Sequence, residues 1–201
     1  MNEVTINKNA KLSEHFSLGE LCKTSAKTAD GNIPSHVHIE NLKNLCVNWL
    51  EPLRYNYFML YCRQLGDEPY EKSKNVEPII INSGYRSEAV NKAIGGVKGS
   101  NHLTGCAVDI RVTGIEQAIR YASILLDISA KYKRDLTSSR VCSRLAESMQ
   151  APLCARSNAD FDELLIERSP KGTFWLHFAV RPAPSTGSGA VNRRKVRFIQ
   201  T

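Results

Sequence analysis

Two long stretches of the chain place apolar residues at helical spacing. The first runs from about residue 36 to 64, and the second from Ile115 to Lys131. Apolar residues three, four and seven positions apart line one side of a helix, so each stretch predicts a helix that buries one face. Because proline has no backbone N–H, we expect the first helix to break near Pro52. The apolar positions are Val37, Leu42, Leu45, Trp49, Leu50 and Leu53 in the first stretch, and Ile119, Ala122, Leu125 and Leu126 in the second.

Shorter helices are predicted from their end residues. Ser17 and Glu20 have the spacing of a capping box, and Phe16 and Leu21 are placed to form a hydrophobic staple. A second short helix is expected from Ser87 to Ile94, before two glycines, and another over residues 136–150. Residues 30–34 contain Gly and Pro and predict a turn.

Strands are expected where short apolar runs lie between turn residues. The predicted strands are residues 78–82, 105–112, 161–167 and 173–181, with an edge strand at 195–199. Residues 169–172 form the turn of a hairpin, and the Ser/Gly-rich stretch 184–190 reads as a loose loop. We therefore expect an α+β fold, a small antiparallel sheet with helices packed on one side. Residues 1–201 form one domain, with a core of about 15–181 and a C-terminal tail of 182–201.

Composition limits the possible partners and locations. The 201 residues carry a net charge of +7, which favours polyanions or serves solubility alone. No nucleic-acid motif accompanies the basic residues, so nucleic acid is not an expected partner. No apolar run approaches the roughly 20 residues of a membrane span, and the first ten residues lack the features of a secretory signal. We expect a monomer made in the cytoplasm.

Six cysteines are present, without any CxxC pair. This spacing excludes zinc-finger types and favours free thiols: Cys22, Cys46, Cys62, Cys106, Cys142 and Cys154. Cys106 lies close to the histidine motif described next. In an alternating strand, however, Cys106 and Val108 face away from Ala107 and Asp109. Cys106 is therefore expected to be a core residue and not a metal ligand.

Three residues have the chemistry of a hydrolytic metal site. His102 and Asp109 lie seven residues apart in Ser-Asn-His-Leu-Thr-Gly-Cys-Ala-Val-Asp, and His177 lies in Trp-Leu-His-Phe. Two imidazoles and one carboxylate hold Zn²⁺ with its fourth position open. Zinc activates water and polarises a carbonyl, so the set predicts one zinc ion per chain and peptide hydrolysis.

Arg86 follows the strand just before this motif. Its guanidinium is suited to a substrate carboxylate, although a structural ion pair is the simpler alternative. Tyr85 and Ser100 are candidate substrate-binding or wall residues, and Trp175 shares a strand face with His177. Ser83 and Gly84 are expected to shape the turn.

The motifs SGYRS, SNHLTGCAVD and WLHF, together with HFSLGEL, resemble the zinc D-Ala-D-Ala carboxypeptidase family (metallopeptidase family fifteen), in its phage- and prophage-associated C-terminal-domain type. The resemblance extends from His15 to about Arg181. It implies a hedgehog/D-Ala-D-Ala-peptidase-like fold, a zinc cofactor and cleavage of peptidoglycan stem peptides. It also implies that His102, Asp109 and His177 bind the metal and that Arg86 binds the substrate carboxylate.

One departure from that family concerns the general base. Several members place an acidic residue three positions before the last zinc histidine, or a histidine two positions before it. Here these positions are Phe174 and Trp175. We expect Glu167, across the hairpin from the His177 strand, to be the base; Glu163 and Asp162 are the alternatives.

The function that follows is peptidoglycan hydrolysis, by a D,D-carboxypeptidase or an endopeptidase. The alternative is a non-catalytic, zinc-containing module that binds peptidoglycan with the same fold. Access to the cell wall would come by lysis or another route, or the substrate would be recycled muropeptides.

Overall fold

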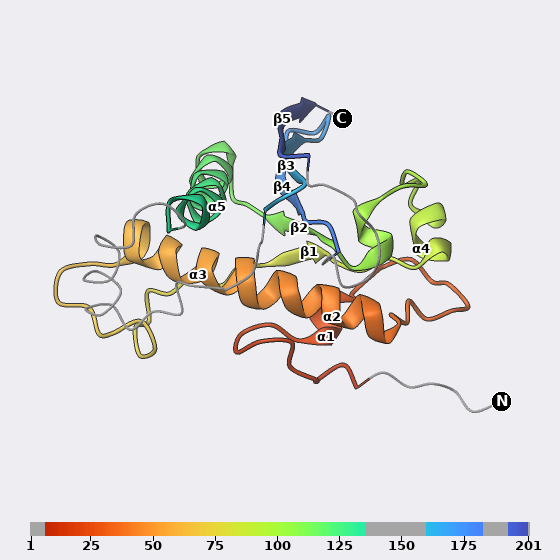
Figure 1. Ribbon diagram of the computed structural model, residues 1–201, viewed down its shortest axis with the longest axis horizontal. Helices are drawn as coiled ribbons and strands as arrows, with labels where there is room; N and C mark the ends of the chain where they lie inside the picture. Colours follow the sequence, from red (N-terminus) through yellow and green to blue (C-terminus); the bar gives the residue numbers. More distant parts are fainter. Residues whose placement is uncertain (1–6, 136–159, 183–192, 201) are drawn as a thin grey trace.

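The computed structural model describes residues 7–135, 160–182 and 193–200. The helix predicted at 136–150, the loop at 184–190 and the thiols of Cys142 and Cys154 lie outside the described residues. Within them the element types agree with the expected α+β fold: helices and a five-stranded sheet (Figure 1). No described helix combines the length and apolar character that a membrane span requires.

The first long helix continues past Pro52, so the predicted break is wrong. α2 (His36–Leu45) passes through a π-helical turn, η1 (Cys46–Leu50), into α3 (Glu51–Tyr57), and a second π turn, η2 (Phe58–Cys62), ends it. Pro52 is the second residue of α3 and directly follows the π turn. The wide turn immediately before Pro52 gives its ring room, so the helix continues.

The other described helices begin at or next to the predicted positions. Ser17 accepts a hydrogen bond from the Glu20 N–H at the start of α1 (Leu18–Leu21), and Ser87 caps α4 (Glu88–Ala93). α5 spans Ile115–Asp135. Its buried side is rotated from the prediction, because Ile119 is 54% exposed while Ala118 and Tyr121 are buried. The other predicted core positions that prove exposed are Leu126 in α5 and Val37 in α2.

The sheet has the order β1-β2-β4-β3-β5. Its strands are β1 (Ile81–Ser83), β2 (Ala107–Arg111), β3 (Glu163–Arg168), β4 (Phe174–Ala179) and β5 (Lys195–Gln200). The first four pair antiparallel, and the β3–β4 hairpin turns at Ser169–Gly172 as predicted.

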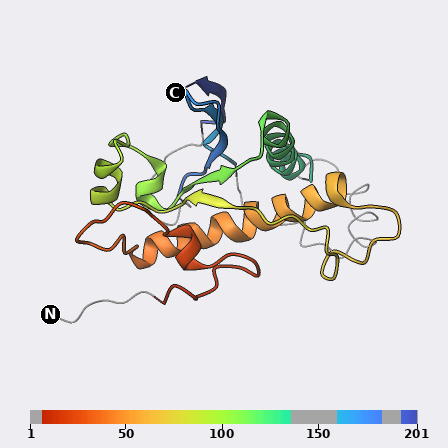
Figure 2. The same cartoon turned by 180° about the vertical axis from the view of Figure 1, so that it is seen from behind.

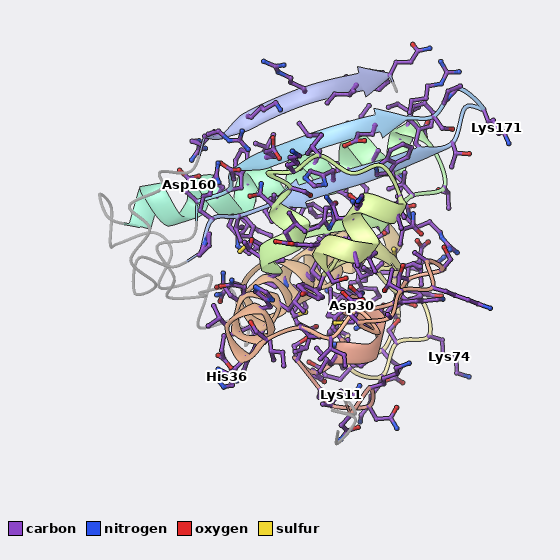
Figure 3. All side chains as sticks on the ribbon, turned by 90° about the vertical axis from the view of Figure 1, so that its right-hand side faces the viewer. Lys11, Asp30, His36, Lys74, Asp160 and Lys171 are labelled. Atoms are coloured by element: carbon purple, nitrogen blue, oxygen red, sulfur yellow. The ribbon has the colours of Figure 1, made fainter. Side chains whose placement is uncertain are left out.

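β5 is the predicted edge strand, but it runs parallel to β3, so the sheet is mixed and not wholly antiparallel. Figure 3 shows β5 at the top, pointing in the same direction as β3. The parallel direction brings Lys195, at the start of β5, into an ion pair with Glu163 at the start of β3. An antiparallel β5 would carry Lys195 to the opposite end of β3.

One face of the sheet forms the hydrophobic core with α2, α3 and α5. Trp49 packs on Phe178 with ring centroids 4.8 Å apart, and Tyr121 of α5 belongs to the same cluster. Figures 1 and 2 show α2 and α3 running below β1 and β2, with α5 beside the sheet. Cys106 is fully buried in this core, as predicted, and the described cysteines are all free thiols. The opposite face of the sheet carries Asp109 and His177.

Candidate metal centre

Three side chains from separate elements meet on this second face. Asp109 of β2 and His177 of β4 are directly opposite each other in the antiparallel ladder. His102 lies in a 3₁₀ turn, η3 (Asn101–Thr104), whose cap Ser100 accepts a hydrogen bond from the His102 N–H. Gly105 then returns the chain to β2 with φ +72°. A Cβ atom there would lie 2.6 Å from the His38 carbonyl oxygen, so glycine is required.

The donor atoms of His102, Asp109 and His177 lie within 4.8 Å of one another. Oδ1 of Asp109 is 3.3 Å from His102 Nε2 and 2.8 Å from His177 Nδ1. All three residues are buried, with exposed fractions of 2%, 8% and 8%. The structure therefore brings together the three residues that the sequence predicts as metal ligands.

Each of these residues also has an outer partner. His102 Nδ1 lies 2.6 Å from the Gly84 carbonyl oxygen. Because a carbonyl oxygen only accepts hydrogen bonds, Nδ1 carries the proton in this contact. His177 Nε2 lies 3.6 Å from Glu163 Oε2. The second carboxylate oxygen of Asp109, Oδ2, forms an ion pair with Arg86 Nη2. Such partners fix the tautomer and the orientation of metal-binding side chains.

The electrostatics suit a bound cation. Burial lowers the pKa of His102 and outweighs the nearby Asp109 carboxylate, which keeps the imidazole neutral and able to ligate. Burial alone would lower the pKa of His177 too, but hydrogen bonds to Asp109 and Glu163 raise it to about 9. Burial would raise the pKa of Asp109, yet the two histidines hold it well below its ordinary value. A divalent cation would take the place of the His177 proton, and this donor set fits zinc.

Arg86 is held at the edge of the cluster. Besides its pair with Asp109, it donates from Nε to Ser83 Oγ over 2.8 Å. The pair with Asp109 is the structural ion pair that the sequence allowed as the alternative to substrate binding. Nη1 makes neither contact, so the guanidinium keeps donors for a further ligand.

The other predicted substrate-binding residues have different surroundings. Trp175 is on the same face of β4 as His177 and lies opposite Glu167. Ser100 caps the His102 turn. Tyr85 is only 6% exposed and packs on His38, with ring centroids 5.0 Å apart. Its substrate-binding role stays a prediction.

The three candidate bases have different surroundings. Asp162 is fully buried and forms ion pairs with Arg181 and Arg193. Glu163 contacts His177, Lys195 and Arg193, and the hydrogen bond from His177, with those cations, lowers its pKa to about 2.

Glu167 lies four residues beyond Glu163 in β3, on the same face, with Leu165 between them. Burial raises its pKa, and the carboxylates of Asp109 and Glu163 add to that effect. The contact of Glu163 with His177 was not predicted; alternation along β3 was the available signal, since Glu163, Leu165 and Glu167 share a face. The contact of His102 with the Gly84 carbonyl was not predicted either, because a backbone carbonyl leaves no signal in the pattern of side chains.

Comparison with known proteins agrees with this centre. Residues 69–131 match the family model described as Peptidase M15, which confirms the resemblance to metallopeptidase family fifteen over that segment. The segment includes Arg86, His102 and Asp109, whereas His177 lies beyond it and joins these residues only through the folded structure. No curated protein matches the chain significantly.

Proposed function

We propose that this chain, with its Peptidase M15 segment, is a zinc-dependent metallopeptidase that hydrolyses peptidoglycan stem peptides. The observation that carries the proposal is the buried His102–Asp109–His177 cluster, which shares one sheet face with Glu167. The reaction is that of a D,D-carboxypeptidase or an endopeptidase. The protein acts as a monomer, and lysis or another route brings it to the cell wall.

His102, Asp109 and His177 would hold one zinc ion. When bound, zinc polarises the peptide carbonyl and makes water a nucleophile at neutral pH. Gly84 and Glu163 orient the two imidazoles, and Arg86 holds the second oxygen of Asp109. These partners preorganise the ligands before the ion arrives.

Glu167 is the proposed general base. Asp162 is held by two arginines, and Glu163 is engaged with His177 and Lys195, so neither has a free carboxylate. The raised pKa of Glu167 suits a proton acceptor that must later give the proton back. It takes a proton from the attacking water as the new C–O bond forms, and passes it to the leaving amine as the C–N bond breaks.

Arg86 is proposed to bind the substrate carboxylate through the donors that Asp109 and Ser83 leave free. Trp175 would form one wall of the substrate site, because on the shared face it lies opposite Glu167 and next to His177 along β4. Ser100 would contribute polar contacts from the His102 turn.

A second candidate is a zinc-containing module that binds peptidoglycan without cleaving it. It is favoured by Phe174 and Trp175, which occupy positions where several family members carry an acid or a histidine. The two candidates differ in turnover and not in metal content.

The proposal is tested with soluble muropeptides and with zinc content. Wild-type protein is expected to hold one zinc per chain and to release stem-peptide fragments; a chelator should stop the release and added zinc should restore it. His102→Ala, Asp109→Ala and His177→Ala should each lose the metal, whereas His36→Ala, at an exposed helix position, should keep it. Zinc retained in all three cluster variants would refute the site.

A further inference from the structure

The face that carries the metal cluster extends two strands beyond His177. Asp109 pairs with His177, His177 pairs with Leu165, and Leu165 pairs with Arg197. Residues in register on neighbouring strands point to the same side of a sheet. Arg197 of β5 therefore lies in one cross-strand row with two of the proposed metal ligands, with the buried Leu165 as the floor between them.

Contacts along β5 confirm which side chains face the site. Lys195 donates from Nζ to Glu163 Oε1 over 3.0 Å, on the side of the cluster. Phe198 packs against Phe174 on the opposite face, with ring centroids 6.2 Å apart. Alternation then places Lys195, Arg197 and Ile199 on the site face.

The cations at this edge differ in how they are engaged. Lys195 and Arg193 form ion pairs with Glu163, and Arg194 pairs with Asp160. Arg197 is exposed and, within residues 7–135, 160–182 and 193–200, has no acidic partner at salt-bridge distance. With respect to the part of the chain that the structure describes, its five donors can serve a ligand that approaches along the row.

We infer that Arg197 determines specificity by binding a carboxylate of the substrate on the amino-terminal side of the scissile bond. This inference rests on the proposed function. Arg86 lies on the β1 side of the cluster and is assigned the carboxyl-terminal end, so the peptide continues towards β5. Two strand spacings separate His177 from Arg197, about 10 Å. An extended peptide covers this span in about three residues. The expected substrate is an acidic peptide with a carboxylate about three residues before the bond.

The test uses two acetylated pentapeptides that end in D-Ala-D-Ala and differ only in Glu or Gln at the third residue before the scissile bond. Turnover is measured with the zinc-loaded full chain, and peptide binding by calorimetry in the Glu167→Gln background. Arg197→Gln and Arg197→Lys are compared with wild type. The matched control is Arg120→Gln, which removes a half-exposed arginine of α5 on the other side of the sheet.

Wild type is expected to prefer the Glu peptide. Arg197→Gln should weaken binding of that peptide and raise its KM by about tenfold, since a charge-assisted hydrogen bond of about 1.5 kcal/mol corresponds to this factor. The Gln peptide should be unaffected, Arg197→Lys should keep part of the preference, and the control should keep all of it. Equal preference in wild type, or equal loss for both peptides in Arg197→Gln, would overturn the inference.

The two proposals fail in different ways. Loss of the binding preference in Arg197→Gln, with no turnover by wild type, would support the carboxylate site and refute D,D-carboxypeptidase activity. Turnover of both peptides without discrimination would support the peptidase and refute the role of Arg197.

Discussion

His177 Nε2 lies 3.6 Å from Glu163 Oε2, while His177 Nδ1 lies 2.8 Å from Asp109. The ring therefore spans two carboxylates, one in the metal cluster and one behind it. A carboxylate behind a metal-binding histidine sets the tautomer and increases the basicity of the ligand. Glu163 is in this sense a positioning residue.

Glu163→Gln is accordingly expected to weaken zinc affinity by about 10–100-fold, the usual effect of losing such an outer partner. The measurement is zinc competition against a chelator of known affinity. Glu71→Gln, at an exposed loop position, is the control. Because Glu163 also pairs with Lys195 and Arg193, the thermal midpoint is measured in parallel. An unchanged zinc affinity in a folded variant would remove Glu163 from the site.

Glu167→Gln is expected to keep stoichiometric zinc and lose turnover by about 10²–10⁴-fold, the usual contribution of a general base. The amide keeps the shape of the side chain but cannot accept the proton. Zinc content and kcat are measured on the same sample. Full activity in this variant would show that another group is the base.

Arg86→Ala is expected to raise KM by about tenfold or more, because it removes charge-assisted hydrogen bonds to the substrate carboxylate. It should also weaken zinc binding, since Asp109 loses the partner of its outer oxygen. Steady-state kinetics at saturating zinc separate these effects. An unchanged KM would leave Arg86 with its structural ion pair alone.

The stability that Asp162 contributes is expected to decrease at acid pH. Burial alone would raise its pKa, but Arg193, Asn101 and Arg181 hold the pKa well below the ordinary value. The carboxylate therefore contributes its full stability above about pH 4, the unfolded pKa. That contribution falls as the pH drops towards the folded pKa.

Asp162→Asn should lower the free energy of unfolding by about 2 kcal/mol at pH 7, the scale of hydrogen bonds to a charged group, and by less at pH 3. Urea unfolding at both pH values measures this, with Glu68→Gln at an exposed position as the control. An equal effect of Asp162→Asn at pH 7 and pH 3 would contradict the ionic role.

The sequence predicted most of what local patterns determine. Helical spacing predicted α2, α3 and α5, and the motifs predicted that Asp109 and His177 would meet, which the β2–β4 register confirms. The direction of β5 is a matter of pairing between strands about thirty positions apart in the chain, which no local pattern contains. Continuation through Pro52 depends on a π turn that leaves no sequence signal. The contact of His102 with the Gly84 carbonyl likewise has no sequence signal, whereas strand alternation would have pointed to Glu163 beside His177.

The most direct test of the central claim is digestion of purified peptidoglycan by the zinc-loaded chain, followed by mass spectrometry, with Asp109→Ala as the blank. Wild type alone is expected to release new stem-peptide fragments, and their masses identify the bond that is cleaved. One tightly held zinc per chain without any fragment would contradict hydrolysis and favour the non-catalytic binding module.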